Sequence, residues 1–278
     1  MALGIALYWK TRPAPALRQT QAAGASLPSP SPRIPASPRP VPEPSSPPSP
    51  SPNVESPASA RVAIVIDDLG NDATATGRIA NWPYRVSGAV LPALPGSARA
   101  ARELEESGKE VLLHLPMEPR QYPQMRPGPG VVLRSQTEDE IARTLESDLD
   151  SVPGAVGVNN HMGSAATADP RVMRAVVGVL ARRGLFFLDS RTTGATVARE
   201  AAKEGRVRAV SRRVFLDDVA TEPAVTRQVA ELVASAREEG FAVAIGHPYP
   251  ATLAVLEREL PRLAGRGVRI VPVGDLAK

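Results

Sequence analysis

Proline is concentrated in one part of this chain, and that distribution limits where a fold can form. Of the 30 prolines, 15 lie between Thr11 and Ala60, in a stretch whose centre reads PSPSPRIPASPRPVPEPSSPPSPSP. Each proline removes a backbone donor and restricts φ, so this stretch disfavours both helix and sheet. It favours extended polyproline II conformers, which act as a semi-rigid spacer; a PxxP ligand for a partner domain is the alternative. We therefore expect a linker over residues 11–60 and a folded domain over residues 61–278.

The run from Met1 to Trp9 is almost wholly apolar and is followed by Lys10 and Arg12. It is too short to cross a bilayer, which takes about 20 residues, but it fits the end of an anchor or signal segment. We interpret residues 1–10 as the remnant of such a segment, with a frayed apolar terminus as the alternative. A hydrophobic stub, a spacer and a compact domain together predict a periplasmic or envelope-associated protein that is tethered or exported through its N-terminus.

Composition excludes several classes of protein. From Arg61 onward the chain carries 28 basic and 27 acidic side chains, and all of it holds only ten aromatic residues. It therefore lacks the basic, aromatic-rich face of a nucleic-acid-binding protein. There is no cysteine, which excludes disulfides and thiolate zinc sites and leaves nitrogen and oxygen as the metal ligands. We expect a monomer that has no nucleic-acid partner and meets a membrane only through its N-terminal segment.

From Arg61 the pattern changes to short β-branched runs that alternate with helical stretches. This alternation predicts an α/β fold with crossover helices. The predicted strands are 62–66, 84–90, 110–113, 155–158, 185–188, parts of 207–216, 242–245 and 268–271. The predicted helices are 97–107, 138–150, 170–182, 196–204, 223–238 and 251–264. Thr137 and Glu140 have the spacing of a capping box, and the other predicted N-caps are Ser97, Asp169 and Thr221.

Seven or eight strands with crossover helices fit either a barrel or an open doubly wound sheet. Polar residues follow nearly every predicted strand, whereas an open sheet concentrates them at one switch point. We therefore expect an irregular (β/α) barrel of seven or eight strands, with its functional site at the carboxyl ends of the strands.

The three histidines each follow a predicted strand: His114 in VLLHLP, His161 in VGVNNHMGS and His247 in AVAIGHP. A single histidine is more often a packed residue, but three at strand ends favour one shared site. A fourth strand ends in Asp67 and Asp68. Adjacent side chains diverge, so one carboxylate can bind a metal while the other accepts a proton from water; a turn and helix cap is the alternative.

Seven segments resemble, in the right order, the divergent polysaccharide deacetylases related to the NodB-type carbohydrate esterases. They are IDDLG at 66–70, LPALPGS at 91–97, HLPMEP at 114–119, NNHMGSAAT at 159–167, LDSRTT at 188–193, FLDD at 215–218 and GHPYP at 246–250. The resemblance covers essentially all of residues 61–278. It implies an irregular (β/α) barrel, usually directed to the cell envelope, in which one aspartate and two histidines bind a metal.

The resemblance also implies a ligand set. Asp68 matches the metal-binding aspartate, and His114 matches the first metal-binding histidine. The usual second histidine, four residues further on, is replaced here by Glu118. His161, at the end of the following strand, is our candidate for the missing ligand. With two imidazoles and one carboxylate, the expected cofactor is a divalent metal, zinc before others, with an open coordination position.

Catalytic roles follow from the same resemblance, and candidate substrate contacts follow from side-chain chemistry. Asp67 matches the general base, and His247 matches the histidine that protonates the leaving amine. Asn159 is expected to orient ligands or substrate, and Tyr122 is a further candidate to stack on a sugar ring. The residues predicted to contact substrate are Asn160, Asp189, Arg191 and Tyr249.

These residues predict a metal-dependent hydrolase of the cell envelope that removes acetyl groups from an acetylated glycan. Hydrolysis of an acetamide needs a dication, a base for water and an acid for the amine, and each has a candidate. The alternative is a catalytically inactive metal-binding or glycan-binding envelope protein, which the replacement at Glu118 favours. Hydrolysis of a phosphate or another ester is a third hypothesis, weakened because no glycine-rich phosphate cradle is present. If imidazoles hold the metal, its affinity is expected to fall as they protonate near pH 6.5.

Overall fold

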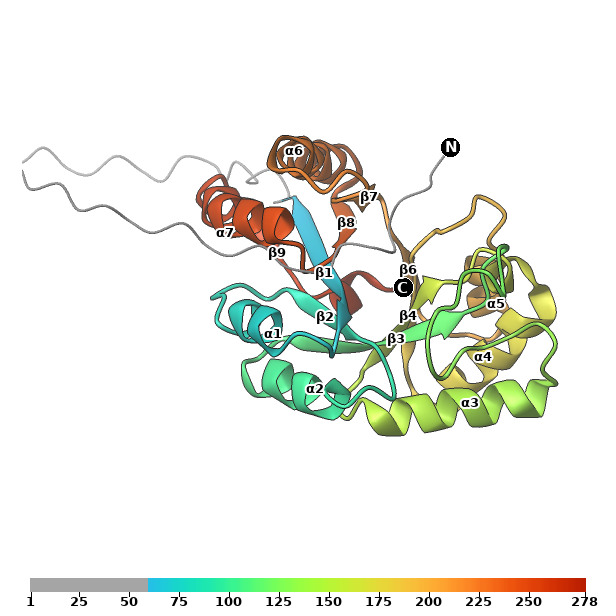
Figure 1. The fold of residues 1–278 in the computed structure, drawn as a ribbon. Coiled ribbons are helices and arrows are strands. Elements are labelled where there is room, and N and C mark those ends of the chain that lie inside the picture. Colours follow the sequence, from blue (N-terminus) through green and yellow to red (C-terminus); the bar gives the residue numbers. More distant parts are fainter. Residues whose placement is uncertain (1–59) are drawn as a thin grey trace, which may run out of the picture. The chain divides into compact units, whose positions relative to one another are not determined.

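The computed structural model describes residues 60–278; the predicted anchor remnant and the predicted linker up to residue 59 lie outside them. Strands and helices alternate along the chain (Figure 1). The strands are β1 (Arg61–Leu69), β2 (Ser87–Val90), β3 (Glu110–Met117), β4 (Gly157–Met162), β5 (Phe186–Asp189), β6 (Ala209–Ser211), β7 (Val214–Phe215), β8 (Phe241–Gly246) and β9 (Arg269–Ile270). The helices are α1 (Ala73–Ala80), α2 (Ser97–Glu106), α3 (Glu138–Ser151), α4 (Pro170–Arg183), α5 (Ala198–Glu204), α6 (Glu222–Glu239) and α7 (Pro250–Gly265), with short 3₁₀ turns η1 (Ala166–Ala168) and η2 (Val273–Leu276).

The strands form one curled parallel sheet in the order β6-β5-β4-β3-β2-β1-β8-β7, and β9 pairs with the start of β1. The two ends of this path, β6 and β7, are consecutive in the chain. Arg212 and Arg213 join them, and their N–H groups donate to the carbonyls of Asp189 and Val243 at 3.0 and 2.8 Å. In a regular barrel, hydrogen bonds between β6 and β7 would close the sheet. Here the short connecting segment takes that place. The predicted irregular (β/α) barrel is confirmed.

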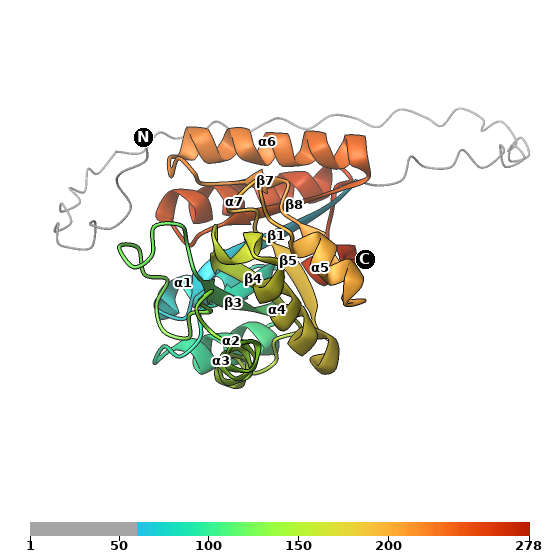
Figure 2. The same ribbon diagram turned by 90° about the vertical axis from the view of Figure 1, so that its right-hand side faces the viewer.

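Two hydrophobic clusters cover the two faces of this sheet. The larger joins Val62, Ile64 and Ile66 of β1 to residues from all seven α-helices, which surround the barrel (Figure 2). The smaller takes the alternate residues Ala63 and Val65 and, apart from the strands, only residues from the C-terminal segment around η2. The smaller cluster is therefore the interior of the barrel. Burying one large aliphatic side chain contributes about 1.5–3 kcal/mol.

Helix ends follow the local chemistry of their sequences. The capping box of Thr137 and Glu140 is present at the start of α3, and the Asp169 side chain accepts from two N–H groups at the start of α4. Thr221 is the N-cap of α6, without a side-chain hydrogen bond. Ser97 was wrongly predicted as an N-cap: Gly96 takes that position, and the Ser97 hydroxyl bridges the turn before the helix, where it accepts from the Leu94 N–H.

Helix α1 was not predicted, because ATATGRIA contains threonine and glycine, which have low helix propensity. The structure shows what starts it: the Asp72 side chain accepts from the N–H groups of Thr74 and Ala75 at 2.8 and 3.0 Å. The predicted strand 84–90 is shorter than expected and begins at Ser87. Among the helices of residues 60–278, none combines the length and apolar character needed to cross a membrane.

Candidate metal centre

Polar side chains form the layer directly above the interior core. Asp67 lies near the carboxyl end of β1, His114 and Asn159 lie within β3 and β4, and Ser190 and His247 directly follow β5 and β8. Side chains alternate along a strand, so residues two positions apart share a face. On four of these strands, the residue two positions earlier belongs to the interior core: Val65, Leu112, Leu188 and Ile245. The barrel therefore aims these polar groups inward at one end.

Asp68 would point outward if β1 continued regularly, and a local irregularity turns it. The pairing of β1 with β2 shifts register between Ile66 and Leu69, and Asp68 has a φ of 58°. A left-handed backbone costs a non-glycine residue about 1–2 kcal/mol, and such irregularities re-aim side chains at functional sites. Met162, the last residue of β4, and Arg191, after β5, also have positive φ, of 54° and 51°. The strand ends around the site are therefore held in unusual conformations.

Three donor atoms meet at one point. Asp68 Oδ1 lies 3.2 Å from His114 Nε2 and 3.1 Å from His161 Nδ1, and the two nitrogens are 3.1 Å apart. In a tetrahedral zinc site with bonds of 2.0–2.1 Å, ligand atoms lie about 3.3–3.4 Å from one another. Asp68 Oδ1 is buried, yet no described group donates a geometrically sound hydrogen bond to it. The donor set therefore fits a divalent cation, and the structure brings together the three predicted ligands.

Asn159 connects the general-base candidate to a metal-ligand candidate. Its Oδ1 lies 2.9 Å from His114 Nδ1, and its Nδ2 donates to Asp67 Oδ1 at 2.9 Å and lies 3.3 Å from Ser190 Oγ. In this arrangement His114 carries its proton on Nδ1, which leaves the Nε2 lone pair free for a metal. Asn159 is fully buried, and its partners His114 and Asp67 are buried as well.

Asp217 holds His247 on the other side of the site. Its Oδ1 lies 3.0 Å from His247 Nδ1, while its Oδ2 accepts from the His247 backbone N–H and from Thr252 Oγ1 at 2.6 and 2.8 Å. This contact leaves His247 Nε2 directed toward the metal ligands, 3.8 Å from Asp68 Oδ2. The sequence shows that Asp217 follows a strand but does not reveal this pairing, because the two residues lie 30 positions apart.

These contacts shift the pKa values of the site. Burial raises the pKa of Asp67, and the nearby His114 and His247 only partly offset it. Burial acts in the same direction on Asp68, but its close contacts with His114 and His161 prevail and hold its pKa far below the usual range. Burial lowers the pKa of His247, but the hydrogen bond with Asp217 and the surrounding carboxylates outweigh it and raise that pKa to about 9. The site without metal thus pairs an imidazolium with carboxylates.

The residues predicted to contact substrate fall into two groups. Asn160 and Asp189 are buried: Asn160 accepts from the Ser190 N–H and donates to the Met162 carbonyl, and Asp189 accepts from the Arg191 N–H. These bonds shape the loops beside the site. The Arg191 side chain is exposed. Substrate contact by these residues stays a prediction.

Two further residues border the site. The Tyr249 ring is half-buried, and its centroid lies 5.4 Å from the centroid of the His247 ring. Its contact with substrate also stays a prediction. The Arg212 guanidinium donates to the carbonyls of Ser190 and Arg191 at 2.7 and 3.1 Å and fixes the loop after β5. No sequence motif pointed to Arg212.

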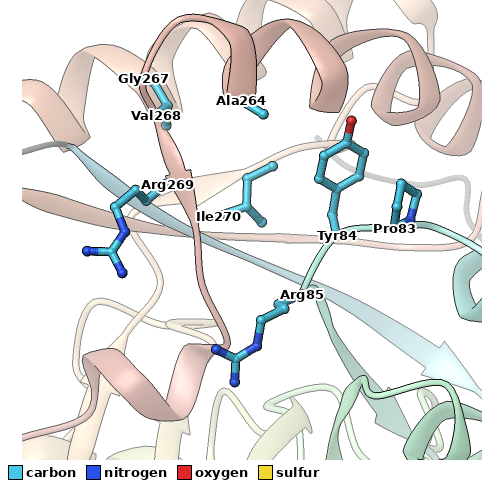
Figure 3. Close-up of a pocket in the computed structure, with 8 residues that line it drawn as sticks. All are labelled: Pro83, Tyr84, Arg85, Ala264, Gly267, Val268, Arg269 and Ile270. Atoms are coloured by element: carbon cyan, nitrogen blue, oxygen red, sulfur yellow. The ribbon is translucent and has the colours of Figure 1, made fainter.

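A cavity of about 380 Å³ lies at the other end of the strands. It opens between the segment before β2 and the residues around β9, which pairs with the first residues of β1. Figure 3 shows Tyr84 and Ile270 at this cavity, with the guanidinium groups of Arg85 and Arg269. The candidate metal ligands lie in the carboxyl-terminal halves of β1, β3 and β4, so this cavity is separate from them.

Comparison with known proteins identifies relatives of the whole folded region. The model of the family described as divergent polysaccharide deacetylase matches residues 64–277. An uncharacterized protein of Haemophilus influenzae is 39% identical over 219 residues, which is 79% of this chain and 77% of that protein. The uncharacterized protein YibQ of Escherichia coli is 41% identical over 207 residues, which is 74% of this chain and 64% of that protein.

Solved structures show the same fold. An uncharacterized protein from Agrobacterium tumefaciens has a TM-score of 0.75 at 27% identity, over 78% of this chain and 89% of its own. A variant of the peptidoglycan deacetylase PdaC of Bacillus subtilis has a TM-score of 0.50 at 11% identity, over 80% of this chain and 91% of its own. The second likeness extends to the fold alone.

Proposed function

The chain belongs to the divergent polysaccharide deacetylase family, and from that premise we propose that it is a metal-dependent hydrolase that removes acetyl groups from a polysaccharide of the cell envelope. One observation supports the proposal most strongly: three potential metal-donor atoms lie between a buried carboxylate and an imidazole whose pKa is raised. Asp68, His114 and His161 offer one donor atom each, and Asp67 and His247 flank them. Amide hydrolysis requires these three functions in one place.

Asp68, His114 and His161 would hold the proposed electrophile. A dication held by Asp68, His114 and His161 would polarise the acyl carbonyl and lower the pKa of the attacking water. Two imidazoles, one carboxylate and no thiolate favour zinc, and three protein ligands leave room for water or substrate. Asn159 supports this set because it fixes the tautomer of His114.

Asp67 serves as the base. Burial raises its pKa, which makes it a stronger base than an exposed aspartate. The Asn159 amide donates to Oδ1 of Asp67, whereas Oδ2 lies 3.5 Å from Nε2 of His114, beside the proposed metal donors. The water gives its proton to Asp67 as the bond between its oxygen and the acyl carbon forms.

His247 serves as the acid. Asp217 keeps Nδ1 bonded and the ring protonated, so Nε2 can pass a proton to the amine nitrogen as the carbon–nitrogen bond breaks. The products are acetate and a free amine on the sugar. The other deacetylase reaction, on an O-acetyl group, would use the same proton to leave an alcohol.

The location in the envelope rests on sequence alone. The apolar run from Met1 to Trp9 and the proline-rich stretch after it fit a domain held away from a membrane. Fractionation of cells that express the full chain tests this part of the proposal: recovery in the cytosol would reject it.

The test of the function combines bound metal with turnover. Purified protein is assayed for zinc by elemental analysis and for acetate release from acetylated chito-oligosaccharides. We expect about one equivalent of metal, and Asp67→Asn should lower kcat about 10²- to 10⁴-fold while the metal content stays unchanged. Asp218→Asn, which changes the exposed neighbour of Asp217, is the control and should retain activity.

The competing function is binding without turnover. It draws support from Glu118, which stands where the usual deacetylase motif has its second histidine. Metal bound at full occupancy with no acetate released from any acylated glycan would establish a binding protein and reject the hydrolase.

A further inference from the structure

The Glu118 carboxylate is bonded to Arg134. Its Oε1 accepts from Arg134 Nε and Nη2 at 3.0 and 2.9 Å, and its Oε2 accepts from the Arg134 backbone N–H at 2.6 Å. Glu118 is 8% exposed and stands outside the group of metal-donor atoms. A carboxylate that already receives three N–H groups has little capacity left for a cation. Glu118, at the usual histidine position, therefore serves as an ion-pair partner of Arg134 and not as a metal ligand.

This ion pair closes a loop at its base. The Glu118 N–H donates to the Val132 carbonyl at 3.0 Å, and the Val132 N–H donates to the Pro116 carbonyl at 2.8 Å. Met117 and Val132 form an isolated β-bridge. The chain thus leaves the end of β3 and returns to the same point, which is the form of an Ω-loop. We call residues 119–133 the clasp loop, with Glu118 and Arg134 as its clasp.

The clasp loop lies against the loops that carry site residues. The Arg120 N–H donates to Ser164 Oγ at 3.1 Å, and Arg120 Nη2 donates to Thr193 Oγ1 at 3.2 Å. Ser164 follows β4, which carries His161, and Thr193 follows β5. In Figure 2 the loop is the green segment at the left, on the side of the carboxyl end of β1. It therefore borders the metal centre on the β4 and β5 side.

Part of the loop's surface is free to meet a ligand. Gln121, Gln124 and Arg126 are exposed, Tyr122 is half-buried, and Met125 is 46% exposed. Amides beside apolar and aromatic surface suit a pyranose, which has an apolar face and a rim of hydroxyl groups. The clasp loop presents such amides and such apolar surface next to the proposed reaction centre. The reaction centre would contact the acetylated group, and the loop could contact the rest of the polymer.

We propose that the clasp loop binds the sugars next to the one that loses its acetyl group, and that Glu118 is a positioning residue that holds this loop. The proposal rests on the proposed function and adds to it a preference for polymers over small acyl substrates. Glu118 replaces a metal ligand with a loop anchor, and His161 takes over the ligand position. The departure from the usual motif then serves substrate selection.

The test breaks the ion pair between Glu118 and Arg134 by changing Arg134, its more exposed member. Arg134→Ala is suitable because the Arg134 side chain is 51% exposed, so its truncation leaves the core intact. Arg143→Ala, an exposed arginine on α3, is the matched control. In holoprotein, we expect amide hydrogen exchange at Glu118, Arg120 and Val132 to accelerate at least tenfold in Arg134→Ala, with α6 unchanged. The zinc affinity should stay within about twofold.

The substrate comparison separates this proposal from the function itself. For Arg134→Ala, we expect KM for a chitin hexasaccharide to rise at least tenfold while kcat/KM for 4-nitrophenyl acetate stays within twofold; Arg134→Lys should recover part of the loss. Equal losses on both substrates, or no change in either exchange or KM, would overturn the proposal. If the wild type hydrolyses neither substrate, the proposed function fails, and the affinity for the hexasaccharide, measured by calorimetry, tests the loop alone. A tenfold weaker affinity of Arg134→Ala supports the loop's role, and an equal affinity rejects it.

Discussion

Replacing Asp217 by asparagine removes the charge that keeps His247 protonated. The carboxylate lies 3.0 Å from His247 Nδ1 and its side chain has no solvent exposure, so water screens the interaction weakly. With it, the pKa of His247 is about 9. Asp68 and Asp67 remain in the variant, so we expect the pKa to fall by between about 1 unit and the full 2.5 units that separate it from an ordinary histidine. At 1.36 kcal/mol per unit, the change is about 1.4–3.4 kcal/mol.

The effect on activity follows from the proton on His247. At pH 8, a group with a pKa of about 9 is about 90% protonated, whereas one with a pKa between about 6.5 and 8 is about 3–50% protonated. If His247 is the acid, kcat of Asp217→Asn at pH 8 should fall about 2- to 20-fold more than at pH 6. The alkaline limb of the pH profile should move down by the same amount as the pKa.

The assay starts with metal-free protein, because a bound dication would itself shift the titration. The ring protons of three histidines are followed by NMR from pH 5 to 10 in wild type, Asp217→Asn and the control Asp218→Asn. Stability gives a second check: a raised histidine pKa stabilises the fold below pH 6.5, and this contribution disappears as the pH rises through 9. The variant should therefore lose more stability at pH 6 than at pH 10. An unchanged titration of His247 would refute the reasoning.

Three other substitutions test separate parts of the structure. Asn159→Ala should weaken zinc binding about 10- to 100-fold, measured by chelator competition, because it removes the partner that orients His114; unaltered affinity would contradict this. Burial raises the pKa of Asp148 to about 8, so its ionisation destabilises the fold increasingly from about pH 4 to 8. Urea unfolding should therefore find Asp148→Asn more stable than wild type at pH 9 and nearly equal at pH 4, whereas exposed Asp150→Asn should show no such trend. Leu112→Ala, in the interior core, should cost about 2–5 kcal/mol of unfolding free energy, and a loss below 1 would argue against a packed interior.

The sequence was most informative about features that follow from the regular alternation of strands and helices. Alternating strands and helices predicted the barrel, and the position of each histidine after an apolar run placed His114, His161 and His247 at one end of it. Because all the strands are parallel, their carboxyl ends meet, and residues distant in sequence become neighbours. The same reasoning explains why Asp67 shares the face of the interior core.

The features that sequence reasoning missed depend on contacts with no local signal. The turn of Asp68 toward the histidines needs an irregularity in β1, and nothing in IDDLG distinguishes it from a regular strand end. The bond between Asp217 and His247 joins two strand ends that only the sheet order brings together. In the sequence, Glu118 only breaks the usual histidine motif. Its ion pair with Arg134 could not be foreseen, because the two residues are separated by a long loop. Such pairings become predictable only when the tertiary structure is known.

The most direct measurement is the zinc affinity of the wild type and of His161→Ala. His161 is the ligand that the usual motif does not supply, so the convergence of Asp68, His114 and His161 rests on it most heavily. Titration at pH 7.5 should give one tight site in the wild type and an affinity at least 100-fold weaker in His161→Ala, and anomalous diffraction at the zinc edge should place the ion between the three side chains. An equally tight site in His161→Ala, or an ion bound elsewhere, would contradict the account.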